Sequence, residues 1–155
     1  MDADNLKLLI REIVEKACAL KDKHTNEIKA PVNYACIFCQ SREEYDELMK
    51  TVSIIGKVIH KTSMGPIFYI KPINTVSGAL QLLKIRLPDS ARHELGDADF
   101  TVSDYSTFKQ KYLVKKGFKL LLRENFEMIE LMDPDSEVLA YFSHPPLDEQ
   151  FGIKK

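Results

Sequence analysis

The sequence has little net charge, no long apolar run and no cysteine pattern that suggests disulfides. Its 22 basic and 23 acidic side chains leave a formal net charge of −1. A near-neutral chain has no overall attraction to nucleic acid or to an anionic membrane surface, so we expect neither partner. The three cysteines lack the number and spacing of a disulfide-rich secreted domain. Because no signal-peptide pattern and no membrane-spanning run is evident, we expect a cytoplasmic protein.

The second half of the chain contains a complete alternation of strand and helix. A short apolar run at 100–102 is followed by two candidate helix caps, Ser103 and Asp104, and by aromatic residues at helical spacing over 105–112. Gly117 is where this helix should end. Three strand-like runs follow, at 118–122, 126–132 and 137–142, with an Asp-Pro-Asp-Ser turn before the last.

The first half repeats this order at an offset of roughly sixty residues, which is typical of a duplicated half-domain. An apolar strand at 33–39 precedes the capping box Ser41 to Glu44, and Gly56 should end the helix. Three more strand-like runs follow, at 57–61, 67–70 and 79–85. The sequence therefore predicts an α+β fold of two βαβββ modules, residues 31–86 and residues 97–155 with a C-terminal tail, joined by a connector at 87–96.

Residues 1–30 are predicted to form an added helix and a linker. Apolar residues repeat with helical period over this helix: Leu6, Ile10, Ile13, Ala17 and Leu20. We expect the helix to dock on the modules, since its apolar stripe needs a partner surface. The alternative is a loose arm that binds a partner.

The duplicated module resembles the vicinal oxygen chelate superfamily, which includes glyoxalase I, extradiol dioxygenases, methylmalonyl-CoA epimerase and bleomycin-resistance proteins. The resemblance covers about residues 33–144. It is carried mainly by Phe-Thr-Val-Ser-Asp at 100–104, Lys-Lys-Gly-Phe at 115–118 and Met-Asp-Pro-Asp-Ser at 132–136. It implies curved half-barrel sheets with a cavity on their concave side, and a possible homodimer that closes the cavity.

The resemblance also implies where a metal would bind, because enzymes of this superfamily place His and Glu ligands on the first and last strands of each module. Those positions fall on Asn33, Gln81, Asp97 and Ala140. One carboxylate, two amides and a methyl group are a poor donor set for a divalent transition metal. We therefore expect no catalytic metal and no other cofactor.

Strand alternation predicts which side chains face the cavity. If Tyr34, Cys36 and Phe38 pack under a helix, Asn33 faces the cavity. The same alternation on the other strands places five further side chains there: Gln81, Asp97, Asp99, Phe142 and His144. Asp97 and Asp99 are the candidate catalytic residues, because two carboxylates on one face raise at least one pKa and so produce a general base. Asn33, Gln81, Phe142 and His144 are the candidate ligand-binding residues. The alternative is that the aspartates are exposed or paired with Arg86 or Arg92.

Three classes of function remain open. The first is a bleomycin-resistance-like protein that binds a small organic ligand without a metal. The second is a metal-dependent lyase, isomerase or dioxygenase, which needs donors such as Asp97 with Asp99, His93 or His144 to converge. The third is a non-catalytic module that binds a protein partner.

Overall fold

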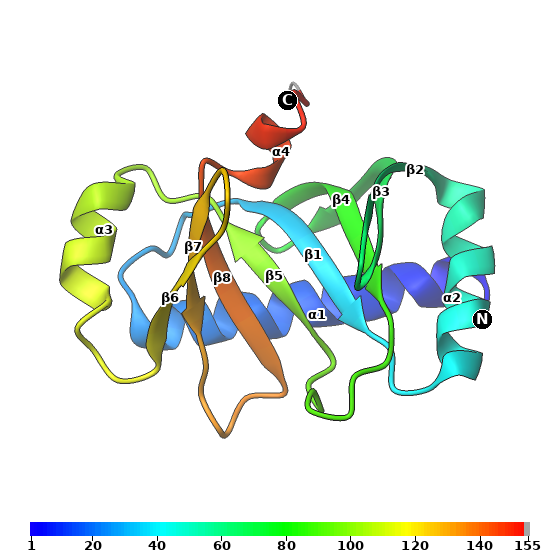
Figure 1. Cartoon of the computed structure of the whole chain (residues 1–155), viewed down its shortest axis with the longest axis horizontal. Coiled ribbons are helices and arrows are strands. Elements are labelled where there is room, and N and C mark those ends of the chain that lie inside the picture. Colours follow the sequence, from blue (N-terminus) through cyan, green and yellow to red (C-terminus); the bar gives the residue numbers. More distant parts are fainter. Residues whose placement is uncertain (154–155) are drawn as a thin grey trace.

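The computed structural model describes residues 1–153, and its centre is one mixed sheet of eight strands. The strands lie in the order β2-β3-β4-β1-β5-β8-β7-β6. Figure 1 shows α1 running along one face of this sheet, with α2 and α3 at its two ends. The first module comprises β1 (Val32–Phe38), α2 (Arg42–Ile55), β2 (Gly56–Thr62), β3 (Gly65–Thr75) and β4 (Gly78–Arg86). The second comprises β5 (Gly96–Phe100), α3 (Tyr105–Tyr112), β6 (Phe118–Leu122), β7 (Glu127–Leu131) and β8 (Val138–His144).

The two modules confirm the predicted βαβββ duplication, and they share a single sheet. In each module the first strand pairs in parallel with the last, β1 with β4 and β5 with β8. The seam between the modules is the antiparallel pair β1 and β5. Gly96 allows the close approach at this seam, since a Cβ atom there would lie 2.1 Å from the Cys36 carbonyl oxygen.

The expected helix starts are present. The Ser41 side chain accepts a hydrogen bond from the Glu44 backbone N–H at 3.1 Å, and Asp104 accepts one from the Thr107 N–H at 3.1 Å. Gly56 ends α2 as predicted, but α3 ends at Tyr112, before the predicted stop at Gly117. Gly117 instead lies in the turn into β6, with a φ of 95° in the region that favours glycine. The strand expected at 100–102 instead spans Gly96–Phe100. Two aspartates fit in that strand because both lie on its cavity side.

The N-terminal helix α1 (Ala3–His24) is docked on the sheet, as predicted. Its apolar stripe is completely buried against β5, β8 and α2. The stripe consists of Leu6, Ile10, Ile13, Val14 and Ala17. Burying each of these larger side chains contributes about 1.5–3 kcal/mol, so the helix belongs to the core. No helix among residues 1–153 combines the length and hydropathy needed to cross a membrane.

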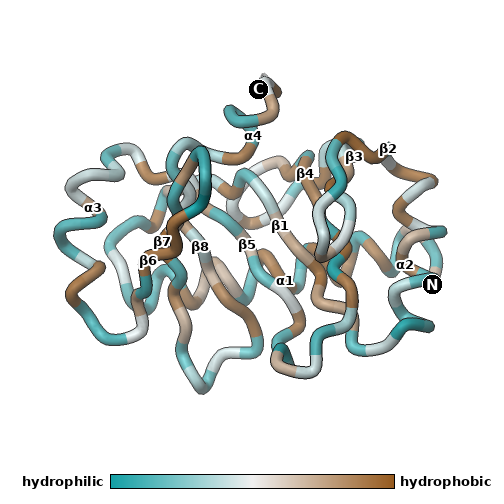
Figure 2. Tube along the Cα trace, viewed as in Figure 1, coloured by the Kyte–Doolittle hydropathy of each residue, from teal (hydrophilic) through white to brown (hydrophobic). Residues whose placement is uncertain are grey.

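Side chains pack on both faces of the sheet. The larger core lies between the sheet and α1, α2 and α3. A smaller apolar cluster covers the opposite face, where the short helix α4 (Leu147–Gln150) also packs. Figure 2 shows hydrophobic positions along the central strands and hydrophilic ones in the turn between β7 and β8.

Candidate functional site

The candidate site is a cavity of ≈ 870 Å³ on the sheet face opposite α1, α2 and α3. Its floor comes from the central strands β1, β4, β5 and β8, and its rim from β2, β3, the β6–β7 turn and α4. Phe151 and Leu147 cover one side. The size and the mix of apolar and polar lining are typical of a small-molecule site.

One row of side chains crosses the floor from strand to strand. In the pairing registers Cys36 lies opposite Lys84 on one side and opposite Asp97 on the other, and Asp97 lies beside Leu139. Neighbouring strands lie about 4.8 Å apart, so Lys84 and Asp97 flank Cys36 within reach of one small molecule. The row thus presents an ammonium group, a thiol and a carboxyl group.

Asp97 is buried, with 7% of its surface exposed, and its Oδ1 atom has no hydrogen-bond partner among the described residues. Burial raises the pKa of this carboxyl from 3.8 to about 8, and the charge of Asp99 adds to the rise. Lys84 and Arg86 act in the opposite direction on the same pKa. Asp97 is therefore largely protonated at neutral pH.

Asp99 is completely buried but well hydrogen-bonded. It accepts hydrogen bonds from the Ser143 backbone N–H at 3.1 Å, from the Ser143 hydroxyl and from Asn33 Nδ2 at 3.2 Å. Burial raises its pKa to about 6, and these donors limit the rise. Asp99 thus ties β5 to β8 and to the start of β1.

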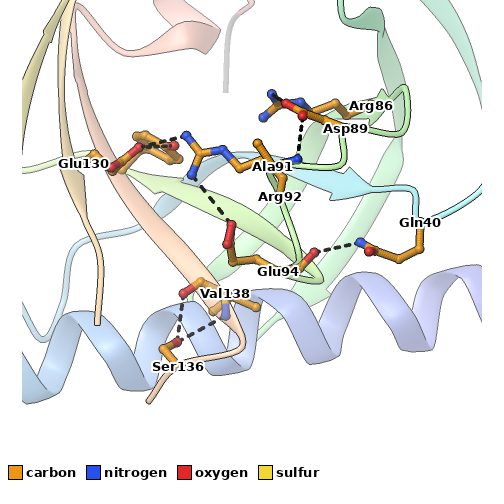
Figure 3. Close-up of polar contacts among 10 residues, drawn as sticks. Gln40, Arg86, Asp89, Ala91, Arg92, Glu94, Glu130, Ser136 and Val138 are labelled. Atoms are coloured by element: carbon orange, nitrogen blue, oxygen red, sulfur yellow. Dashed lines mark hydrogen bonds and ion pairs between the residues drawn. The ribbon is translucent and has the colours of Figure 1, made fainter. Parts of the chain in front are cut away.

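The two arginines near the site pair with other acids. Arg86 Nη2 donates to Asp89 Oδ2 at 3.2 Å, and Arg92 lies 3.6 Å from Glu94 and 3.7 Å from Glu130. Figure 3 shows Arg92 between these two glutamates. Within residues 1–153 no ion pair joins either arginine to Asp97 or Asp99. The predicted alternative of an Arg–Asp pair is therefore wrong, and so is that of exposed aspartates.

Glu130 is held from a second side, since the Tyr141 hydroxyl donates to it at 2.7 Å. Arg92 belongs to the connector between β4 and β5, whereas Glu130 and Tyr141 lie on β7 and β8. These contacts fix the connector against the second module at the edge of the cavity.

The four predicted ligand-binding residues do not lie together. Asn33 donates to Asp99 and to the Thr101 hydroxyl at 2.9 Å, beside the floor. Gln81 Nε2 donates to the Tyr69 hydroxyl at 3.1 Å, in a separate groove near β2. Phe142 is completely buried in the helix-side core, with its ring 4.4 Å from that of Phe108. His144 stacks on Tyr105 at 4.6 Å, outside the cavity.

The cavity placement of Phe142 is wrong because the alternation phase is reversed on β8, and the same reversal occurs on β1. Tyr34 and Cys36 face the cavity, whereas Ala35 and Ile37 pack under the helices. On β8 the cavity side carries Tyr141. Only for β5 is the predicted phase correct, so Asp97 and Asp99 line the cavity as expected.

Sequence reasoning missed Lys84, Arg86 and Arg92 as lining residues. A signal for the first two is present, since Lys84 and Arg86 alternate with the apolar Leu83 and Ile85. Basic residues at every second position mark one face of a strand as polar. Arg92 lies in an irregular connector, where the sequence carries no such periodicity.

The metal that the superfamily resemblance implies does not fit the side chains present. The cavity-facing row on the first and last strands is Lys84, Cys36, Asp97 and Leu139. An ammonium repels a divalent cation, and burial raises the pKa of the Cys36 thiol, which opposes thiolate ligation. Among residues 1–153 no three His, Cys, Asp or Glu side chains cluster as a metal site would require.

Comparisons with known proteins show a likeness of fold. No protein-family model and no curated protein matches the sequence significantly. A structural-genomics structure of a protein named EC4020 superposes with a TM-score of 0.70 at 10% identity, over 92% of this chain and 87% of that one.

Two further matches have lower scores. A glyoxalase/bleomycin resistance protein/dioxygenase superfamily member from Vibrio splendidus 12B01 has a TM-score of 0.45 at 13% identity, over 74% of this chain and 97% of its own. Methylmalonyl-CoA epimerase from Mycobacterium tuberculosis has a TM-score of 0.43 at 11% identity, over 77% and 90%. The protein thus consists of two βαβββ modules joined through their first strands in one eight-stranded sheet, the duplicated architecture that the sequence pattern predicts.

Proposed function

We propose that the protein binds a small organic ligand in this cavity, with Asp97 as its polar anchor. The supporting observation is the buried Asp97 Oδ1 atom, which has no hydrogen-bond partner within the described chain. A buried polar atom without a partner costs about 1–3 kcal/mol. A ligand that hydrogen-bonds Asp97 recovers this energy, and the apolar rim covers the remainder of the molecule.

In this proposal the side chains of the protein bind the ligand directly, without a metal ion. Lys84 and Arg86 supply positive charge to the cavity, and this charge repels a divalent cation. This arrangement supports the metal-free class over the metal-dependent one. The homodimer that the resemblance implies, and a role in binding a protein partner, stay as predictions.

Thermal-shift screening against a library of small metabolites tests the proposal. A ligand of the cavity should raise the melting temperature, because it binds the folded state alone. The shift should be lost in Asp97→Asn, in which the hydrogen-bonding group differs and the shape is kept. Asp46→Asn on the exposed side of α2 is the matched control and should keep the shift. Ligands that stabilise Asp97→Asn as well as wild type contradict the proposal.

Proton transfer at carbon is a second candidate function, favoured by the Asp97 pKa of about 8. A carboxyl group with a pKa near the working pH is suited to removing a proton next to a carbonyl. Lys84, in the same row, would stabilise the negative charge that develops on the carbonyl oxygen. Ligands found by screening should then exchange that hydrogen in D₂O with wild type and retain it with Asp97→Asn.

A further inference from the structure

We propose that the ligand of the cavity is an organic anion, whose carboxylate or phosphate is bound by Lys84 and Arg86. This inference rests on the proposed function, namely that the cavity holds a small molecule. It adds the chemical class of that molecule and the side chains that select it.

The placement of the two cations is the first argument. Leu83 and Ile85 are completely buried under the helices, so Lys84 and Arg86 project from the opposite face of β4 into the cavity. Strand pairing fixes both positions, since Lys84 lies opposite Cys36 and Arg86 opposite Phe38. Both cations therefore stand on a rigid central strand.

Unfilled hydrogen-bonding capacity is the second argument. Within residues 1–153, the Lys84 ammonium group makes no hydrogen bond or ion pair. Arg86 binds Asp89 through Nη2 and lies with its guanidinium carbon 4.9 Å from the centroid of the Phe38 ring, but its buried Nε atom has no acceptor within the described chain. The arginine is thus held in place by two contacts while one donor remains available. An anionic oxygen is the acceptor that such donors bind most strongly.

The charge balance of the cavity is the third argument. The lining contains four cations, Lys84, Arg86, Arg92 and Arg123, and three acids, Asp97, Asp99 and Glu124. Asp97 is largely neutral at pH 7, because burial raises its pKa to about 8. Asp99 is occupied by Ser143 and Asn33. Arg86 and Arg92 have acidic partners outside the lining, so the uncompensated positive charge of the floor is that of Lys84. Protonated Asp97 can itself donate to an anion.

The remaining lining describes the body of the ligand. Aromatic and aliphatic side chains surround the charged floor: Ile67, Leu121, Phe126, Met128, Leu147 and Phe151. A charged end with an apolar or aromatic body matches this division. Phenylacetate and phenyl phosphate are simple probes of that chemistry, while phenylacetamide is a neutral analogue and 2-phenylethylammonium a cationic one.

Ligand-observed NMR titration of the full chain at pH 7 with these four probes tests the inference. We expect phenylacetate or phenyl phosphate to bind saturably, and the amide and the ammonium at least about tenfold more weakly, as a charge-assisted hydrogen bond implies. Comparison of the two anions decides between carboxylate and phosphate.

Substitutions then locate the binding. Lys84→Met should weaken anion binding about tenfold and leave the amide unchanged, while Lys84→Arg should retain binding. Lys119→Met, at an exposed lysine of β6, is the matched control and should have no effect. Melting curves of each variant establish that it is folded. If Lys84→Met does not fold, Lys84→Gln, which also removes the charge, takes its place in the test.

The outcomes separate this inference from the proposed function. Equal or tighter binding of the amide or the ammonium overturns the anionic class but leaves a small-molecule site in place. Anion binding that the folded Lys84→Met variant leaves unchanged overturns the assignment of Lys84. Absence of binding by all four probes overturns the inference, whereas the proposed function fails only if the metabolite screen is also negative.

Discussion

Asp97 and Asp99 lie two residues apart on the same face of β5, yet only Asp99 is surrounded by hydrogen-bond donors. Ser143 and Asn33 bind Asp99, whereas the Oδ1 atom of Asp97 has no partner within residues 1–153. Burial raises both pKa values, to about 8 for Asp97 and about 6 for Asp99. The same substitution should therefore have opposite effects at the two positions.

Asp97→Asn should stabilise the protein at pH 8. The folded pKa of about 8 exceeds the ordinary 3.8, so the folded protein keeps a proton that the unfolded chain releases. The stability linked to this proton is fully present below about pH 4 and is lost as the pH rises through 8. Removing the ionisable group should raise the free energy of unfolding at pH 8 by roughly 1–3 kcal/mol. Urea unfolding at pH 6, 7 and 8 measures this difference.

Between pH 6 and pH 8 the change in stability comes from Asp97 rather than from Asp99, because Asp99, with a pKa of about 6, loses its proton at lower pH. The other titratable or charged groups that face Asp97 are Lys84 and Arg86 from β4, Glu130 from β7, Cys36 and Tyr34 from β1, and Tyr141 from β8. A wild-type free energy of unfolding that rises from pH 6 to pH 8 would falsify the assignment of a protonated Asp97.

Asp99→Asn should destabilise the protein. Three donors point at this carboxylate, and an asparagine amide would place its own donors against some of them. The expected loss is about 1–3 kcal/mol, the cost of buried donors without acceptors. The same urea titration at pH 7 measures it. Ser143→Ala removes one donor and should cost less; equal stability of Asp99→Asn and wild type would contradict this role.

Lys21→Met should destabilise the N-terminal segment. Lys21 is completely buried, and its ammonium donates to the Glu27 carbonyl at 2.6 Å and the Ile28 carbonyl at 3.3 Å, 5.3 Å from the Phe100 ring centroid. Methionine fills the space but leaves both carbonyls unsatisfied, at a cost of about 1–3 kcal/mol. Thermal unfolding compares it with Lys29→Met, an exposed lysine of the same linker. Equal melting temperatures of the two variants would show that the Lys21 hydrogen bonds to the Glu27 and Ile28 carbonyls do not stabilise this segment.

Ile13→Ala tests the docking of α1. Ile13 is completely buried, and its Cδ1 atom packs at the Gly96 seam, 3.1 Å from where a Cβ of Gly96 would lie. The cavity left by this truncation should cost about 2–5 kcal/mol in chemical denaturation. Leu8→Ala on the opposite side of the helix, where Leu8 is 60% exposed, should change stability by less than about 0.5 kcal/mol. A similar small change for both variants would mean that α1 does not contribute to the core.

The sequence predicted the order of elements because each boundary has its own chemistry. Ser41, Asp104 and Gly56 act locally, and the structure places all three at the helix starts and the helix end that the sequence predicts. The docking of α1 was predictable for a similar reason, since its apolar stripe needs a partner surface.

The composition of the site was less predictable, because strand phase depends on which face is polar. On β5 the aspartates alternate with Ala98 and Phe100, so the phase was clear. On β1 all seven residues are buried, since helices cover one face and the cavity cluster the other. Alternation then carries no signal, and the face that the sequence predicts for Cys36 is the wrong one.

The predicted phase is reversed on β4 as well, which explains Gln81. Gln81 alternates in phase with Leu83 and Ile85, and these two pack under the helices while Lys84 and Arg86 line the cavity. The pairing of β3 with β4 also shifts between Tyr69 and Ile73, next to Gln81, so its amide lies in the separate groove near β2.

The most direct measurement of the central claim is backbone amide NMR of the ¹⁵N-labelled protein during titration with phenylacetate. A ligand in the cavity should shift amides on the central strands, at 34–36, 84–86 and 97–99, which lie together only on the cavity floor. Those shifts should be lost in Lys84→Met. Shifts that instead cluster around the exposed lysines at 115–119, or that are unchanged by the substitution, would contradict a ligand site built on Lys84 and Asp97.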